Sequence, residues 1–130
     1  MQQGALRALE FDRIVEAVAG FAVTPMGVDR LSRLAPSTDP QQVADWQAAT
    51  TETVRFVTAH GLFPLRASSE LPEILEALGV QGRALESLRL LGLATFLDSI
   101  DETRSGIRRA QEGFPLLDAV VSGAASFKGE

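Results

Sequence analysis

The 130-residue chain contains no cysteine, a single histidine (His60) and a single lysine (Lys128). Without cysteine it forms no disulfide and offers neither a thiolate metal site nor a cysteine nucleophile. One histidine excludes histidine-rich metal sites and leaves a Ser-His-Asp triad without support. Lys128 is followed by Gly129. A phosphate-binding P-loop needs Ser or Thr after its lysine, so this class of nucleotide site is excluded as well.

Excess positive charge and long apolar runs are also missing. The formal net charge is −5, whereas a domain that grips a DNA backbone by itself is usually basic. No apolar run reaches the ~18 residues that a membrane-spanning helix needs. The opening MQQGALRALEFD lacks the basic-then-apolar order of a signal peptide. We therefore expect no membrane partner and a cytoplasmic location. At this length the chain is one domain or a piece of a larger protein.

Apolar residues recur at helical spacing through the first half of the chain. They predict helices over residues 5–19, 25–34 and 40–59. A restart at Glu10 or Asp12 would divide the first of these into two short helices.

Two proline-containing steps predict where helices begin. Thr24-Pro25 and Asp39-Pro40 each place a capping side chain before a proline. Proline fits the first helical position because its missing N–H has no intrahelical partner there, and the Thr or Asp oxygen accepts from the free N–H groups of the first turn.

The second half predicts a short helix over residues 71–78, a long helix from residue 83 or 84 to 110, and a short last helix over residues 116–121. Within the long helix, residues 88–97 are apolar on nearly every face. A segment of this kind is buried in a core or in a partner interface. No alternating strand and no internal repeat is found.

The fold class is therefore predicted to be all-α, an irregular multi-helix domain with one long leucine-rich helix. We expect the helical domain to cover residues 1–121. Residues 122–130 are small and polar, and we expect a flexible tail or a truncation point there.

Two groups of carboxylates are candidates for a catalytic or a metal-binding site. Glu10 and Asp12 would diverge on a helix, so a solvated or capping role fits them better than acid–base catalysis. Asp98, Asp101 and Glu102 form a helix-spaced acidic patch that suits ion pairs on a helix surface better than a metal. The pairs expected are Asp101 with Arg104 and Arg108 with Glu112. We predict no catalytic, cofactor-binding or metal-binding residue.

Arg104, Arg108 and Arg109 are the candidates for contact with nucleic acid or a partner in a larger assembly. The flanking acids oppose nucleic-acid binding, and no aromatic residues interleave with the arginines. His60 follows a predicted helix end, where a capping role fits better than catalysis. Trp46 is expected in the core, with a partner surface as the alternative.

Several motifs, read in order, resemble the second-type MutS family, whose members begin directly at the core domain. The similarity covers nearly the whole chain, and residues 9–39 carry its most specific part. The motifs are Leu9-Glu10-Phe11-Asp12-Arg13-Ile14, Thr24-Pro25-Met26-Gly27, Leu34-Ala35-Pro36-Ser37-Thr38-Asp39, Glu52 with Val54, Pro64-Leu65, Ile74, Gly82 and the long leucine-rich helix. The Phe-x-Glu wedge of mismatch-reading MutS proteins is not matched by Phe127-Lys128-Gly129 or by Phe11-Asp12-Arg13.

The resemblance implies a parent protein that is an ATP-dependent, DNA-binding homodimer using ATP and Mg²⁺. It also implies suppression of recombination, a nuclease domain in many members and a link to stalled ribosomes. The ATPase, clamp and nuclease parts would lie beyond residue 130, and no functional residue of the family carries over to a position here. The chain would be the start of the core and lever helices, the N-terminal scaffold of that parent.

Two hypotheses follow. In the first, the segment is a rigid helical scaffold that transmits nucleotide state to a DNA-embracing clamp. In the second, it is a stand-alone helical adaptor that buries residues 88–97 against a partner protein.

Overall fold

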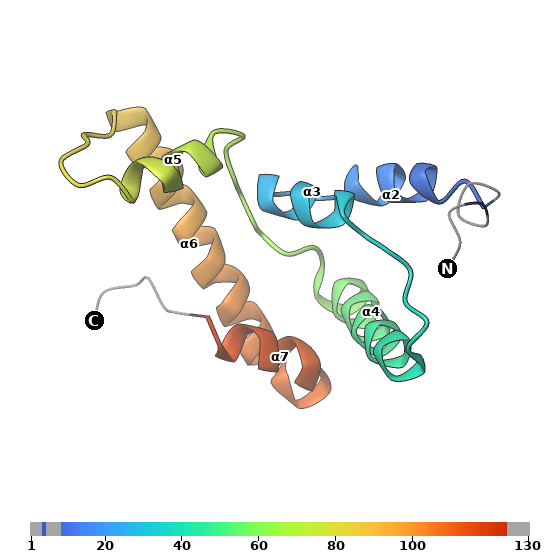
Figure 1. Cartoon of the computed structure of the whole chain (residues 1–130). Helices are drawn as coiled ribbons and strands as arrows, with labels where there is room; N and C mark the ends of the chain where they lie inside the picture. The colour runs from blue at the N-terminus through green and yellow to red at the C-terminus, as the bar shows by residue number, and fades with distance from the viewer. Residues whose placement is uncertain (1–3, 5–8, 125–130) are drawn as a thin grey trace. The chain divides into compact units, whose positions relative to one another are not determined.

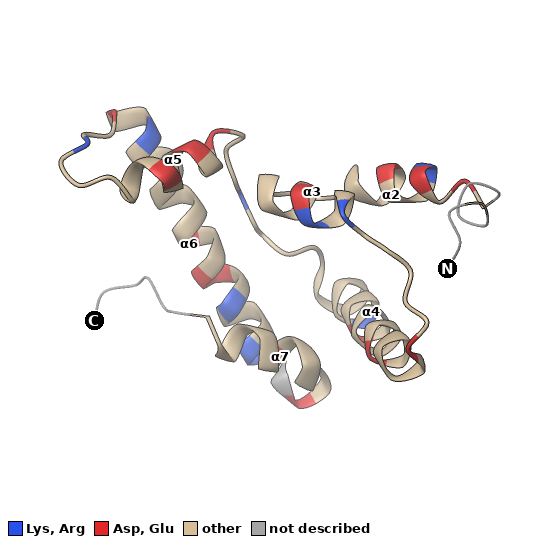
Figure 2. Cartoon of the chain, viewed as in Figure 1, with Lys and Arg blue, Asp and Glu red and all other residues tan. Residues whose placement is uncertain are grey.

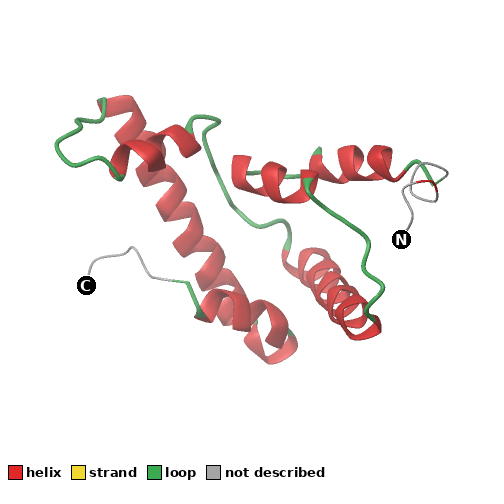
Figure 3. Cartoon of the chain, in the orientation of Figure 1, coloured by secondary structure: helices red, strands yellow, loops and turns green. Residues whose placement is uncertain are grey.

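The structure is a computed structural model that describes residue 4 and residues 9–124. Over these residues it has six α-helices, one 3-10 turn and no strand (Figures 1 and 3). The predicted all-α class is confirmed. The chain divides into two compact units: unit 1 contains Met1–Thr38 and Arg66–Leu93, and unit 2 contains Asp39–Leu65 and Ala94–Glu130. The predicted domain limits stay predictions, since residues 125–130 of the expected tail lie outside the described residues.

Within the described part of unit 1, α2 (Phe11–Ala19) begins directly after Glu10. Glu10 has φ 49° and ψ 40°, a left-handed conformation that non-glycine residues adopt rarely. The start of α2 thus lies next to a position where a restart was predicted, while the division of the first helix into two stays a prediction. Residues 5–8 of the predicted first helix lie outside the described residues.

The next helix, α3 (Pro25–Ser32), begins as the sequence predicts. The Thr24 hydroxyl oxygen accepts a hydrogen bond from the Gly27 N–H at 3.0 Å, and Pro25 takes the first helical position. The helix ends two residues before the predicted residue 34. It packs against α2, and it also contacts α5 within unit 1.

The helix α5 (Leu71–Leu78) has the predicted bounds and stops before Gly79. Its buried residues Leu71, Ile74 and Ala77 recur every third position. This spacing puts them on one side of the helix, and that side supplies the most buried apolar residues of unit 1.

Unit 2 contains α4 (Pro40–His60), the 3-10 turn η1 (Gln111–Gly113) and α7 (Pro115–Ser122). The cap predicted at Asp39 is confirmed, because its Oδ1 accepts from the N–H groups of Gln41 at 2.9 Å and Gln42 at 3.4 Å. The core of the unit is the apolar cluster Phe56, Ile107, Phe114 and Val121.

The longest helix, α6 (Ser87–Arg109), begins three to four residues later than predicted. Gly82, at φ 82°, lies in a turn before it, and the first carbonyl bonded at its start is that of Glu86, which accepts from the Leu90 N–H at 3.0 Å. The boundary between the two units falls within this helix. The leucine-rich character is as expected, but the helix starts only after the turn is complete.

The structure contradicts the expected core position of Trp46 and one of the two alternatives for the leucine-rich segment. Trp46 is 49% exposed, because α4 reaches the core only through its later residues Glu52 and Phe56. Leu88 and Leu91 are 80% and 63% exposed, so the start of the leucine-rich segment does not lie in a core. The core alternative is therefore wrong for Leu88 and Leu91, and burial of the segment against a partner stays a prediction.

Candidate functional site

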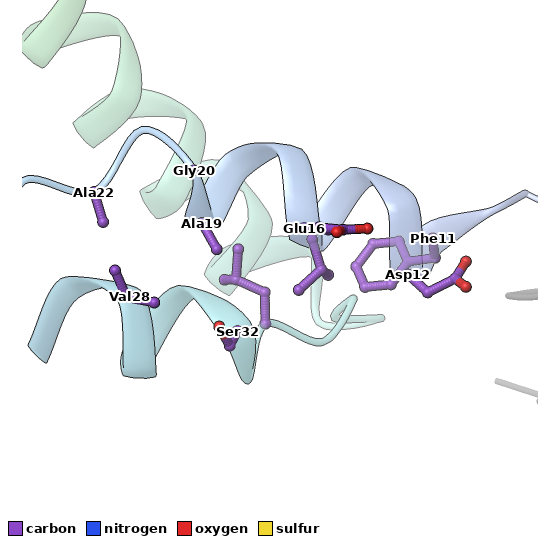
Figure 4. Close-up of a pocket in the computed structure, with 10 residues that line it drawn as sticks. Phe11, Asp12, Glu16, Ala19, Gly20, Ala22, Val28 and Ser32 are labelled. Atoms are coloured by element: carbon purple, nitrogen blue, oxygen red, sulfur yellow. The ribbon is translucent and has the colours of Figure 1, made fainter. Parts of the chain in front are cut away.

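An open apolar groove lies between α2 and α3 in unit 1 (Figure 4). Phe11, Val15 and Ala19 are spaced by four residues along α2, and this spacing brings them to one side of the helix. Val28 from α3 and Ala22 from the connecting loop face them. The cavity has a volume of about 920 Å³, within the range of ligand and peptide sites.

The chemistry of the groove is that of a binding surface. Its polar side chains are Asp12, Glu16 and Ser32, and both carboxylates are exposed on α2. Among the residues that the structure describes, no histidine, cysteine, lysine or arginine lines the groove. The groove can bury apolar side chains of a partner, with the carboxylates of α2 at its edge.

A second apolar surface lies on α5 and the start of α6, also in unit 1. The Arg89 guanidinium, near the start of α6, lies 3.5 Å from the Glu70 carboxylate and 3.6 Å from that of Glu73, at the start of α5. The leucines on either side of Arg89 are left in solvent. The exposed leucines of this surface are Leu75, Leu78, Leu88, Leu90 and Leu91. Leu75 with Leu78 on α5, and Leu88 with Leu91 on α6, are three residues apart, so each pair shares one side of its helix.

The carboxylates singled out in the sequence are not brought together as a catalytic pair. Glu10 is the residue before α2, makes no side-chain capping hydrogen bond, and pairs with Arg13 at 3.3 Å on the surface. Asp98 and Glu102 are exposed, whereas Asp101 is only 4% exposed. Asp101 therefore does not belong to a surface acidic patch, because α6 turns it toward the interior of unit 2.

Metal binding finds no support in the described part of the chain, where no group of three or more His, Asp or Glu side chains is arranged to hold an ion. The expected pairs Asp101–Arg104 and Arg108–Glu112 stay predictions. None of the helices among the described residues is long and apolar enough to cross a membrane.

The three candidate arginines lie on the last turns of α6, and Figure 2 colours arginine positions blue. Arg108 and Arg109 are exposed. Arg104 is half-buried, and its Nε has no hydrogen-bond partner. Their contact with nucleic acid or a partner stays a prediction, but only Arg108 and Arg109 offer freely accessible guanidinium groups.

His60 is the last residue of α4 and belongs to an aromatic cluster. Its ring centroid lies 4.9 Å from that of Phe56 and 5.6 Å from that of Phe114. The His60 ring is tilted by 39° from that of Phe56 and by 79° from that of Phe114. Its position at a helix end does not reveal the contact with Phe114, because that residue is distant in sequence.

Sequence reasoning also missed two polar residues of unit 2. The buried Glu52 carboxylate accepts a hydrogen bond from the Leu117 N–H at 2.8 Å, across 65 residues of chain. The Arg55 guanidinium lies 5.7 Å from the centre of the Phe114 ring, a cation–π distance. Both partners lie at or just before the start of α7, so no local spacing signals these contacts.

Comparison with curated proteins finds relatives that share one name. The chain is 33% identical over 94 residues to Endonuclease MutS2 of Geobacillus thermodenitrificans, a match covering 72% of this chain and 12% of that protein. It is 32% identical over 120 residues to Endonuclease MutS2 of Symbiobacterium thermophilum, covering 92% of this chain and 15% of that protein. Endonuclease MutS2 of Gemmatimonas aurantiaca is 33% identical over 109 residues, which cover 83% of the chain and 13% of the relative.

The chain is a MutS2-family segment. The resemblance drawn from its motifs is thereby confirmed. The segment spans between 12% and 15% of the length of these three relatives, so the activity in their name describes proteins several times longer. No family model matches the chain, and no solved structure matches it.

Proposed function

We propose that this MutS2-family segment is a helical scaffold, and that its apolar surfaces pack against further helices of a MutS2-type parent protein. The observation that carries the proposal is the exposure of large apolar side chains in unit 1, from the groove between α2 and α3 to Leu88 and Leu91 on α6. Exposed apolar area of this extent is typical of surfaces that are covered in an assembly.

The role of the parent is proposed from the family. We propose an ATP- and Mg²⁺-dependent, DNA-binding homodimer that suppresses recombination, with endonuclease activity as the relatives are named and with contact to ribosomes. In that protein the segment would be the N-terminal start of the core and lever, and its helices would carry nucleotide state to a DNA clamp. ATP hydrolysis and DNA cleavage would belong to other parts, and the location would be cytoplasmic.

The test is reconstitution in two pieces. A MutS2 relative lacking the segment matched here is expressed separately and mixed with the purified 130-residue chain. We expect a stable complex by size-exclusion chromatography, recovery of ATPase activity in the complex, and neither ATP hydrolysis nor DNA cleavage by the chain alone. Saturable ATP hydrolysis by the chain alone, or a failure to associate with the remainder, would overturn the scaffold role.

A stand-alone helical adaptor is the second candidate, and the observation that favours it is the exposed leucine surface on α5 and α6. An adaptor would bind a separate protein through Leu88 and Leu91 without needing the rest of a MutS2 chain. In the two-piece experiment it would fail to restore ATPase activity, and that result distinguishes the two functions.

A further inference from the structure

A second pocket, of about 420 Å³, lies within unit 2 and is separate from the apolar surfaces of unit 1. It is formed by the end of α4, the loop that follows it, and one face of α6. The scaffold role proposed above does not involve this pocket. Its two walls differ from each other in chemical character. One is aromatic and the other is charged.

The aromatic wall is formed by Phe63 and His60, both held by Phe56. The rings of Phe56 and Phe63 are stacked, with centroids 5.2 Å apart and planes inclined by 13°. Phe56 is only 5% exposed and is part of the core of unit 2. Its fixed position orients Phe63, which is half-buried, and His60, which is exposed. Preorganised rings at a pocket edge are suited to stacking on another planar ring.

The charged wall is one face of α6. Glu102 and Arg109 line the pocket seven residues apart, which is two helical turns and therefore about 10 Å along the axis. Arg109 forms no ion pair with any residue that the structure describes. An exposed guanidinium at the rim of a pocket is suited to an anionic oxygen, and especially to phosphate.

Gly106 lies on this face between the two charges and keeps the floor of the pocket open. A Cβ built on it would meet no atom within 4 Å. Glycine in a helix interior costs about 1 kcal/mol relative to alanine, and no neighbouring atom here requires it. The position is therefore a means of filling the pocket without disturbing the protein around it.

We infer that this pocket binds a single nucleotide unit. The base would stack on Phe63 and His60, the phosphate would meet Arg109, and an amino group of the base would donate to Glu102. One guanidinium with a carboxylate nearby suits a monophosphate better than a triphosphate, because the carboxylate repels further negative charge. The pocket volume lies in the range of small-ligand sites.

The pocket also distinguishes Arg109 from the other two candidate arginines. No aromatic residue interleaves with Arg104, Arg108 and Arg109 in the sequence. The fold supplies the missing rings from the end of α4 and its loop, and it supplies them only to Arg109, since Arg104 and Arg108 do not line the pocket. The same nucleotide chemistry is offered by a free nucleotide and by an unpaired nucleotide within a single strand.

The experiment titrates the intact chain with AMP and with a five-residue oligodeoxyadenylate, and follows backbone amide signals by NMR. Saturable shifts around residues 60–63 and 102–110 are expected with at least one probe. Binding of AMP alone identifies a free nucleotide, and binding of the oligonucleotide alone identifies a single strand. Ribose 5-phosphate, which lacks the base, should bind at least tenfold more weakly than AMP.

Matched variants separate binding from folding. Arg109→Ala should weaken binding about tenfold, the loss typical of a charge-assisted contact, while Arg108→Ala on the same turn should change it less than twofold. Gly106→Leu should abolish binding by filling the pocket. The midpoint of its thermal unfolding should equal or exceed that of the unsubstituted 130-residue chain. The inference is overturned if neither probe binds saturably, if Arg108→Ala weakens binding as much as Arg109→Ala, or if ribose 5-phosphate binds as tightly as AMP.

Discussion

Glu52 is the residue whose role depends most on its surroundings. Its side chain is 7% exposed and accepts the Leu117 N–H at 2.8 Å. Leu117 lies in the first turn of α7, and Phe114, the residue before that helix, makes no side-chain capping bond. A carboxylate on α4 therefore satisfies a free N–H at the start of α7, where negative charge is favoured by the helix dipole.

Replacing Glu52 tests this cap. Glu52→Ala should lower the free energy of unfolding by about 1–3 kcal/mol, because a buried N–H loses its acceptor. Glu52→Gln keeps an acceptor oxygen and should lose less. Urea denaturation followed by circular dichroism measures both. Glu112→Ala, at an exposed position on η1, is the control and should stay within about 0.5 kcal/mol of the parent chain. Equal stability of the Ala variant and the parent would show that the cap contributes nothing.

Whether a capping residue can be predicted from the sequence depends on how far along the chain its partner lies. Thr24 and Asp39 were predicted as caps because each bonds an N–H only two or three residues away. Glu52 could not be predicted, because its partner lies 65 residues along the chain. The prediction that Trp46 lies in the core was wrong for a related reason. Its apolar character is visible in the sequence, but which turns of α4 meet the core depends on where α6 and α7 pack.

Among the elements, α4 has the clearest end. Gly61 follows it with φ 85° and ψ −179°, a backbone region that is essentially restricted to glycine. This conformation directs the chain out of the helix toward Phe63, which packs against the core of unit 2. The His60-Gly61 step was predicted as the end of the helix, although the left-handed φ was not.

Substitution at Gly61 should therefore be costly. Gly61→Ala is expected to lower the free energy of unfolding by about 1–3 kcal/mol, the range for a non-glycine residue held in a sparsely populated region. A Cβ at this position meets no atom within 4 Å, so the loss would come from the backbone and not from a clash. Gly113→Ala has equal space and no positive φ, and its thermal unfolding should be close to that of the parent. Equal losses in the two variants would contradict a role for the Gly61 conformation.

The start of α6 was the least accurate boundary. Residues 83–86 carry side chains compatible with a helix, so local propensity extends the helix too far. The turn through Gly82 decides the boundary instead, because the chain must leave α5 and return before α6 begins. Element type was thus predictable from periodicity, while this end depended on the connection.

For the whole molecule, the exposed leucines set its solution behaviour. Leu88 and Leu91 lie on the solvent side of α6 in unit 1, and their removal leaves the buried residues of α5 untouched. We expect the double variant Leu88→Gln, Leu91→Gln to bind the dye ANS more weakly and to associate less at high concentration, as measured by light scattering. Its free energy of unfolding should change by less than about 1 kcal/mol, because both positions are on the surface.

Ser105→Ala, at an exposed site on α6 outside this surface, is the control for the leucine variant and should alter neither property. Unchanged dye binding in the double variant would contradict the identification of these leucines as a partner surface. A large loss of stability would show that they pack within the chain.

The sequence by itself determined the all-α class, the caps at Thr24 and Asp39, the membership of the MutS2 family and the exclusion of a P-loop. Each of these depends on residue types and on contacts within a few positions. Only the tertiary structure decided that Leu88 is exposed and that Arg109 and Phe63 line one pocket. These outcomes depend on how helices that are distant in sequence pack. The same spacing of apolar residues is compatible with a buried core and with an exposed surface that binds a partner.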